Sequence, residues 1–389
     1  MNTCPTAPHF AAAVLLTSLL ASTLAATSAQ AQAAQEPQTV RIAHVGPISG
    51  PAGHIGKDTE NGVRMAIDDA NAQKPVIGGQ RVRFALQAED DQGDPSQAAN
   101  VAQRLCDAKV AGVVGHLQSG TSMPASGVYY KCGLPNITPA ATNPELTRPG
   151  YNTTFRVIAN DAALGAAVAL YASDALGLKK IAVIDDRTAY GQGVTELFKT
   201  TAREKGMNVV ATEFTRDRAV DFLSILTTIR AQDPDAIFYG GLDAQAGPML
   251  RQMEQLGMDR PRFLGGDGLC TEMLPVLASK AALAERVVCA TGGAAVEKMP
   301  GGLAWKKRYD TQYPGRFQIY SPYAYDAAMV LIEAMKRAGS TDPKVYLPAL
   351  RATDHQGVTA RIAFTSRGEL TQPAVTFFTY KDKQRVPLN

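Results

Sequence analysis

Short apolar runs alternate with longer amphipathic segments along most of this chain. The first run, residues 40–45, precedes a segment whose apolar side chains recur at the spacing of one buried helix face: Val63, Ala66, Ile67 and Ala70. Residues 81–88 then carry apolar side chains at every second position, as in a half-buried strand. This alternation of strands and helices predicts a parallel sheet with helices on both faces.

A second series of the same kind begins near Arg156. Its expected strands, separated by segments with helical spacing, are 180–184, 208–214, 236–239, 262–264 and 286–290. The C-terminal part differs, because three helices are expected there before two alternating strands at 359–364 and 374–380. With 389 residues, the chain is also too long for one ordinary core. The pattern predicts an α/β protein with two doubly wound, Rossmann-like lobes.

Composition narrows the class of protein. Apolar residues make up 45% of the chain and charged residues 19%, which is typical of a soluble globular protein. The formal net charge is only +3, and the sequence has no Lys/Arg-rich run and no basic helix face. We therefore expect no nucleic-acid partner.

The N-terminal segment resembles an export signal. Residues 1–35 contain no Asp, Glu, Lys or Arg, residues 10–26 are rich in Ala, Leu and Val, and small residues follow at Ala29, Ala31 and Ala33. We expect residues 1–31 to be a cleaved secretory signal peptide. A short membrane anchor is the alternative, disfavoured because Ser and Thr interrupt the apolar run and basic flanking residues are lacking.

Removal of that segment removes Cys4 and leaves four cysteines. An even number in an exported chain indicates disulfides, and proximity in sequence favours Cys106–Cys132 and Cys270–Cys289 among three connectivities. Four buried free thiols are the alternative. Because the chain has no CxxC pair, we expect no structural zinc and no other metal site.

Two segments place hydroxyl groups just after the carboxyl ends of neighbouring predicted strands. One is residues 115–120, with Ser119, and the other is residues 137–142, with Thr142. Open α/β sheets bind ligands in the crevice at such strand ends. The alternative is a pair of ordinary turns whose Ser and Thr cap helices.

Catalytic motifs are lacking around this crevice. The sequence has neither a GxSxG nucleophile turn nor a GxxxxGK[ST] phosphate loop. His116 lies beside the crevice, but no Ser-base-acid order typical of a catalytic triad is apparent around it. Asp185 and Asp186 follow the end of a predicted strand, where aspartates typically form turns. A crevice without an evident reaction centre favours binding over catalysis, and we expect no cofactor and no enzyme activity.

Several motifs together resemble the type I periplasmic solute-binding proteins of ABC transporters, in the leucine/isoleucine/valine-binding group. The matching stretches run from residue 39 to the C-terminus and are 42–51, 114–119, 137–147, 189–193, 239–241 and 250–252. The resemblance implies two lobes joined by a three-crossover hinge that close on a ligand. It places residues 38–157 with 291–356 in lobe 1 and residues 158–290 with 357–389 in lobe 2. It also implies a periplasmic monomer that delivers its ligand to an inner-membrane ABC permease.

The same resemblance implies a site for an α-amino acid. Ser119 and Thr142 would hold the carboxylate, and the Ala140 carbonyl with the Thr142 hydroxyl would accept hydrogen bonds from the ammonium group. Asp267 would pair with that ammonium, and Tyr190 would close over the ligand. This assignment fits the physics, because a zwitterion leaving water needs donors for its carboxylate and an anion for its ammonium. The remaining expected site residues are Gln118, Ala141, Leu242 and Ile55.

The chain departs from the family pattern at several of these positions. Leu242 and Ile55 stand where the family has aromatic side chains, and Asp267 is one methylene shorter than the usual Glu. The family disulfide near the first turn is missing, since Gln118 and Gly93 occupy its places. An aliphatic, branched-chain amino acid is the expected ligand. The alternatives are a sensing module of the same fold that reports another small amide or carboxylate to a regulator, and an exported hydrolase.

Overall fold

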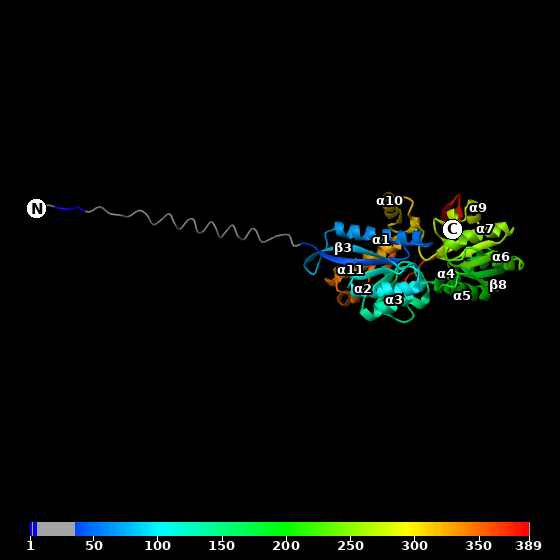
Figure 1. The fold of residues 1–389 in the computed structure, drawn as a ribbon, viewed down its shortest axis with the longest axis horizontal. Helices are drawn as coiled ribbons and strands as arrows, with labels where there is room; N and C mark the ends of the chain where they lie inside the picture. Colours follow the sequence, from blue (N-terminus) through cyan, green and yellow to red (C-terminus); the bar gives the residue numbers. More distant parts are fainter. Residues whose placement is uncertain (2, 6–35, 389) are drawn as a thin grey trace.

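The computed structural model describes residues 1, 3–5 and 36–388, so the predicted signal peptide falls almost wholly outside the described residues. The described chain forms two lobes, each a sheet covered by helices on both faces, that lie side by side along the long axis of the molecule (Figure 1). None of the described helices is long and apolar enough to cross a membrane.

The first lobe contains a six-stranded sheet in the order β2-β3-β1-β4-β5-β6. All neighbouring pairs are parallel except β2 and β3. The strands are β1 (Gln38–Gly46), β2 (Val76–Ile77), β3 (Gln80–Asp90), β4 (Gly112–Gly115), β5 (Asn136–Thr138) and β6 (Thr154–Arg156). The helices are α1 (Gly53–Ala72), α2 (Pro95–Asp107), α3 (Ser119–Cys132), η1 (Pro144–Leu146) and, from late in the chain, α10 (Gly302–Gln312), α11 (Ser321–Ala338) and α12 (Pro343–Arg351).

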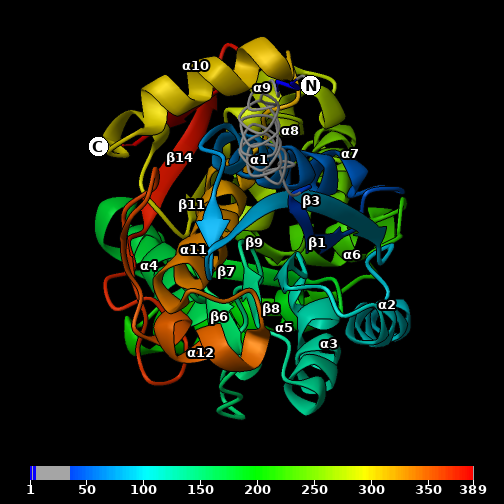
Figure 2. The ribbon, with the colours of Figure 1, turned by 90° about the vertical axis from the view of Figure 1, so that its left-hand side faces the viewer.

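Strand β1 is apolar at four of the six positions 40–45 because both of its faces are buried. Val40 and Ile42 face a core shared with α1 and α11, whereas Ala43 and Val45 face a second core shared with α2 and α3. A parallel strand that is buried on both faces has no polar side. Figure 2, viewed from the end of this lobe, shows α2 and α3 well apart from α11 and α12.

The second lobe contains a seven-stranded sheet in the order β15-β14-β11-β10-β9-β7-β8, with only β14 and β15 antiparallel to their neighbours. The strands are β7 (Lys180–Asp185), β8 (Asn208–Phe214), β9 (Ala236–Gly240), β10 (Arg262–Gly265), β11 (Val287–Thr291), β14 (Thr376–Lys381) and β15 (Gln384–Pro387). The helices are α4 (Asp161–Leu170), η2 (Tyr171–Ala175), α5 (Ala189–Glu204), α6 (Leu223–Arg230), α7 (Asp243–Gln255), η3 (Asp267–Leu269), α8 (Leu274–Leu277) and α9 (Ala281–Ala284). The short helix η4 (Val296–Lys298) follows β11 and packs on lobe 1, where Val296 contacts the core of α11.

The chain crosses between the lobes after β6, after β11 and before β14. Residues 357–370, which the sequence analysis assigned to lobe 2, instead bond to lobe 1. The backbone N–H groups of Val358 and Thr359 donate to the buried carboxylate of Asp326 on α11, and Glu369 pairs with Arg156 at the end of β6. The strands β12 (Asp354–Gln356) and β13 (Arg361–Ala363) form a short ribbon, and the turn between them supplies these donors to Asp326, which is fully buried.

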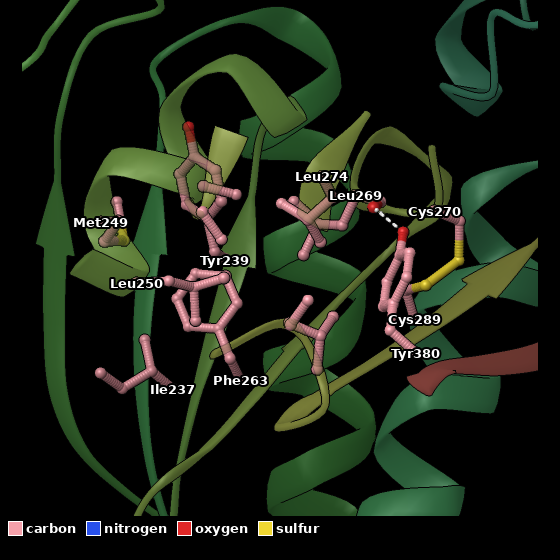
Figure 3. Close-up of a cluster of buried hydrophobic side chains, with 14 of the residues drawn as sticks. Ile237, Tyr239, Met249, Leu250, Phe263, Leu269, Cys270, Leu274, Cys289 and Tyr380 are labelled. Atoms are coloured by element: carbon pink, nitrogen blue, oxygen red, sulfur yellow. Dashed lines mark hydrogen bonds between the residues drawn. A yellow bond between two sulfur atoms is a disulfide. The ribbon is translucent and has the colours of Figure 1, made fainter. Parts of the chain in front are cut away.

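Both expected disulfides are present. Cys106–Cys132 joins the ends of α2 and α3, and Cys270–Cys289 joins the turn after η3 to β11. Figure 3 shows the second bridge beside the core of lobe 2, where the Tyr380 hydroxyl donates to the Leu269 carbonyl oxygen at 2.7 Å. The alternative of four buried free thiols was wrong.

Candidate functional site

A cleft of about 520 Å³ lies between the lobes, at the carboxyl ends of β4 and β5 on one side and of β7, β9 and β10 on the other. Six of the nine expected site residues line it: Gln118, Ser119, Ala140, Tyr190, Leu242 and Asp267. Ala141 and Thr142 are fully buried and directly follow Ala140. Ile55 is fully buried and does not line the cleft.

Lobe 1 contributes two turns that are bonded to each other. The Thr138 hydroxyl donates to the His116 carbonyl oxygen at 2.8 Å and accepts from the N–H groups of Ala140 and Ala141. The Ser119 hydroxyl accepts from the N–H of Asn143 at 3.2 Å. These bonds hold the start of α3 against the turn after β5. The first N–H groups of a helix have no partner within the helix and attract anions, so this half of the cleft is suited to a carboxylate.

Lobe 2 contributes Asp267, which is buried and held by both lobes. Its Oδ1 accepts from the Tyr190 hydroxyl at 2.9 Å and the Gly268 N–H at 3.1 Å, and its Oδ2 accepts from the Tyr320 hydroxyl at 2.9 Å. Burial raises the pKa of Asp267 to about 6, although the tyrosine hydroxyls oppose that rise. The carboxylate is therefore ionised at neutral pH and is available to a cation.

Tyr320, which no sequence motif indicates, lies just before α11 in the C-terminal part of the chain. The buried carboxylate of Asp58 fixes this segment, because it accepts hydrogen bonds from four consecutive backbone N–H groups, residues 318–321. Burial raises the pKa of Asp58. Nothing in the local sequence marks either residue, since Asp58 is on a helix and Tyr320 is one of many aromatic residues.

Asp161, at the start of α4, is a second carboxylate that the sequence analysis missed. It is fully buried, and neither of its carboxylate oxygens has a hydrogen-bond partner among the described residues. The neighbouring Thr142 hydroxyl is also buried and unpartnered there. Burial and the negative charge of Asp267 raise the pKa of Asp161 to about 8, although the nearby Thr142 hydroxyl and the charge of Arg156 oppose that rise. In the sequence, Asn160-Asp161 has the pattern of an ordinary helix start, and Asn160 does cap α4.

Besides the bond from Tyr320 to Asp267, two further polar contacts join the lobes across the cleft. The Asn143 amide donates to the Ala189 carbonyl oxygen at 2.6 Å, and His54 Nε2 on α1 lies 2.8 Å from Asp243 Oδ2 on α7. Burial lowers the pKa of His54, but the hydrogen bond with Asp243 and its charge outweigh burial, so the pKa is raised. The lobes are therefore closed on each other.

The other candidate groups have structural partners. His116 is fully buried, with Nδ1 2.8 Å from Asp91 and Nε2 2.9 Å from the Tyr129 hydroxyl. Asp185 and Asp186 accept from backbone N–H groups of their own turn. In residues 36–388 and the few described before them, no group of three or more His, Cys, Asp or Glu could hold a metal ion.

Comparison with known proteins settles the family. A family model described as periplasmic binding protein matches residues 39–385. The chain belongs to this family. Among curated relatives, an amino acid binding protein of Pseudomonas aeruginosa is 32% identical, over 88% of this chain and 91% of the relative. A leucine-, isoleucine-, valine-, threonine- and alanine-binding protein of the same organism is 30% identical, over 89% of this chain and 91% of that protein.

Solved structures agree with this assignment. The leucine binding protein LivK of Thermotoga maritima superposes with a TM-score of 0.82 at 27% identity, covering 90% of this chain and 98% of that one. The substrate binding protein LivJ of Streptococcus pneumoniae, in complex with isoleucine, has a TM-score of 0.80 at 24% identity and covers 90% and 99% of the two chains, which shows the shared fold. The resemblance and the two-lobed α/β fold inferred from the sequence are confirmed.

Proposed function

We propose that this periplasmic binding protein binds an α-amino acid between its lobes and delivers it to an inner-membrane ABC permease. One observation carries the proposal: the cleft places a helix start with Ser119 opposite the buried carboxylate of Asp267. The first group suits a carboxylate and the second an ammonium ion. Few ligands other than a zwitterion satisfy both groups at once.

Asp161 strengthens the ammonium side of this proposal. A buried carboxylate without hydrogen-bond partners is costly, and an ammonium ion beside Thr142 and Asp267 would supply the missing donors and positive charge. We assign Thr142, Asp161 and Asp267 jointly to the ammonium group, and Tyr190 to the wall that closes over the ligand.

Apolar side chains favour an aliphatic ligand. Leu117, Met123 and Leu242 line the cleft beside the zwitterion groups. Burying a hydrocarbon side chain of leucine size against them is worth about 1.5–3 kcal/mol. The relatives named for leucine, isoleucine and valine support the same class of ligand. The location in the periplasm and the monomeric state belong to this proposal and rest on the predicted signal peptide and on the family.

Calorimetry on the chain without residues 1–31 tests the proposal. Leucine, isoleucine or valine should bind. Isoamylamine, which lacks the carboxylate of leucine, and 4-methylpentanoate, which lacks its amino group, should each bind at least a hundredfold more weakly. Asp267→Asn should weaken leucine binding by more than tenfold, because an amide cannot neutralise the ammonium charge. Asp259→Asn, a matched change at an exposed position, should leave the affinity unchanged.

Absence of heat or of a thermal shift with every α-amino acid at millimolar concentration would overturn the proposal. Wild-type affinity in Asp267→Asn would remove Asp267 from the ammonium site. The permease partner is tested separately by cross-linking the tagged protein in whole cells, where capture of a histidine kinase instead would favour the sensing alternative.

A further inference from the structure

The cleft extends beyond the groups that suit a zwitterion. Its volume of about 520 Å³ lies within the range of about 300–1,000 Å³ that proteins use for drug-sized ligands. Leucine is much smaller than such ligands, so the wall beyond the zwitterion groups also decides which side chains fit. Besides Leu117, Met123 and Leu242, that wall includes the side chain of Gln118.

Gln118 stands at the start of α3, where a side chain commonly accepts from the helix N–H groups. It does not cap the helix, and its amide makes no hydrogen bond with any described residue. The side chain is half-buried beside Gly93, and a Cβ at Gly93 would come within 2.6 Å of Gln118 Oε1. Gly93 has a φ of +69° and no side chain, so it leaves the space that the amide occupies.

The other polar side chains deep in the cleft are engaged. The hydroxyls of Tyr190 and Tyr320 donate to Asp267, and the Thr188 hydroxyl donates to Asp186. The Arg187 guanidinium lies 3.9 Å over the ring of Phe214, at the exposed mouth. The Gln118 amide is therefore a half-buried polar group whose donor and acceptor are both available to a ligand.

We propose that Gln118 is a specificity-determining residue that admits amino acids with neutral polar side chains, bearing a hydroxyl or a carboxamide. An amide donates and accepts but carries no charge, so it complements groups that do the same. Compared with an apolar residue at this position, it improves the binding of a polar side chain relative to the hydrocarbon of the same shape, because the hydrocarbon leaves the amide unpaired in the closed cleft. This inference rests on the proposed function and adds its substrate range.

Two pairs of ligands with matched shape test it: asparagine against leucine, and threonine against valine. Calorimetry gives the ratio of the dissociation constants within each pair for the wild type and for Gln118→Leu. The substitution should shift the asparagine/leucine ratio about tenfold toward leucine. Glycine, which has no side chain, is the reference ligand that measures any general change in affinity, and Gln97→Leu, at an exposed position of α2, should shift neither ratio.

Unchanged ratios in Gln118→Leu, with glycine binding retained, would overturn the inference while leaving the proposed function intact. Failure of every amino acid to bind the wild type would overturn the proposed function itself. If Gln118→Leu does not fold, as judged by circular dichroism, Gln118→Met provides a second apolar side chain of similar length. The same shift toward leucine is then required of Gln118→Met.

Discussion

Asp161→Asn should make the protein more stable and a weaker binder at the same time. In the described structure Asp161 is buried without a hydrogen-bond partner, and its pKa rises from 3.8 to about 8. Between these values the folded chain holds a proton that the unfolded chain releases, so stability falls as the pH rises. Holding that proton at pH 7 costs about 4 kcal/mol.

An asparagine has the same shape as the aspartate side chain and does not ionise, and its amide can donate to the unpartnered hydroxyl of Thr142. The free energy of unfolding of Asp161→Asn should therefore exceed that of the wild type by up to about 4 kcal/mol at pH 7. The gain should shrink toward pH 4, because near the unfolded-state pKa of 3.8 the unfolded chain also begins to hold the proton. Leucine affinity should fall by more than tenfold, because the ammonium group loses one of its two carboxylates.

Urea denaturation at pH 4, 7 and 8, without ligand, measures the stability of the wild type, Asp161→Asn and the exposed control Asp259→Asn. Calorimetry with leucine at pH 8 measures affinity for the same three proteins. A variant that is no more stable at pH 8 than the wild type would refute the argument from burial. Full leucine affinity in Asp161→Asn would refute its place in the ammonium site.

Two further predictions concern closure and the disulfides. His54→Gln should weaken ligand binding about tenfold or more below pH 7, because the hydrogen bond between a protonated His54 and Asp243 stabilises the closed lobes. Since the pKa of His54 is raised on closure, the difference in affinity from the wild type should vanish as the pH rises through that pKa. Calorimetry from pH 6 to 9 measures this, and a constant difference in affinity would contradict the prediction. Replacing Cys270 and Cys289 together by Ser should lower the free energy of unfolding by about 3 kcal/mol, as expected for a loop of 19 residues. Urea denaturation of the variant and the oxidised wild type checks it, and equal midpoints for the two proteins would exclude that contribution.

Local spacing in the sequence determined the order of elements. Helix and strand periods follow from which side of each element is buried, and β1 faces a core on both sides, as its apolar run indicates. Both disulfides were also predictable, because each joins cysteines that lie close in sequence. The turn with Ser119 was recognisable because hydroxyl groups and glycines gather at a strand end. The role assigned to Asp267 came from the family resemblance, since its surrounding residues carry no such signal.

The tertiary structure alone decided which residues surround the side chains that we assign to the ligand. Tyr320 reaches Asp267 only because Asp58, on a distant helix, fixes the segment before α11. Asp161 has the local pattern of a helix start, and only the packing of α4 shows that its carboxylate is buried and unpartnered. Residues 357–370 lie on lobe 1 because Asp326 needs donors there. In each case the deciding interaction joins residues far apart in the chain, and a sequence read along its length does not show which buried charge will find a partner.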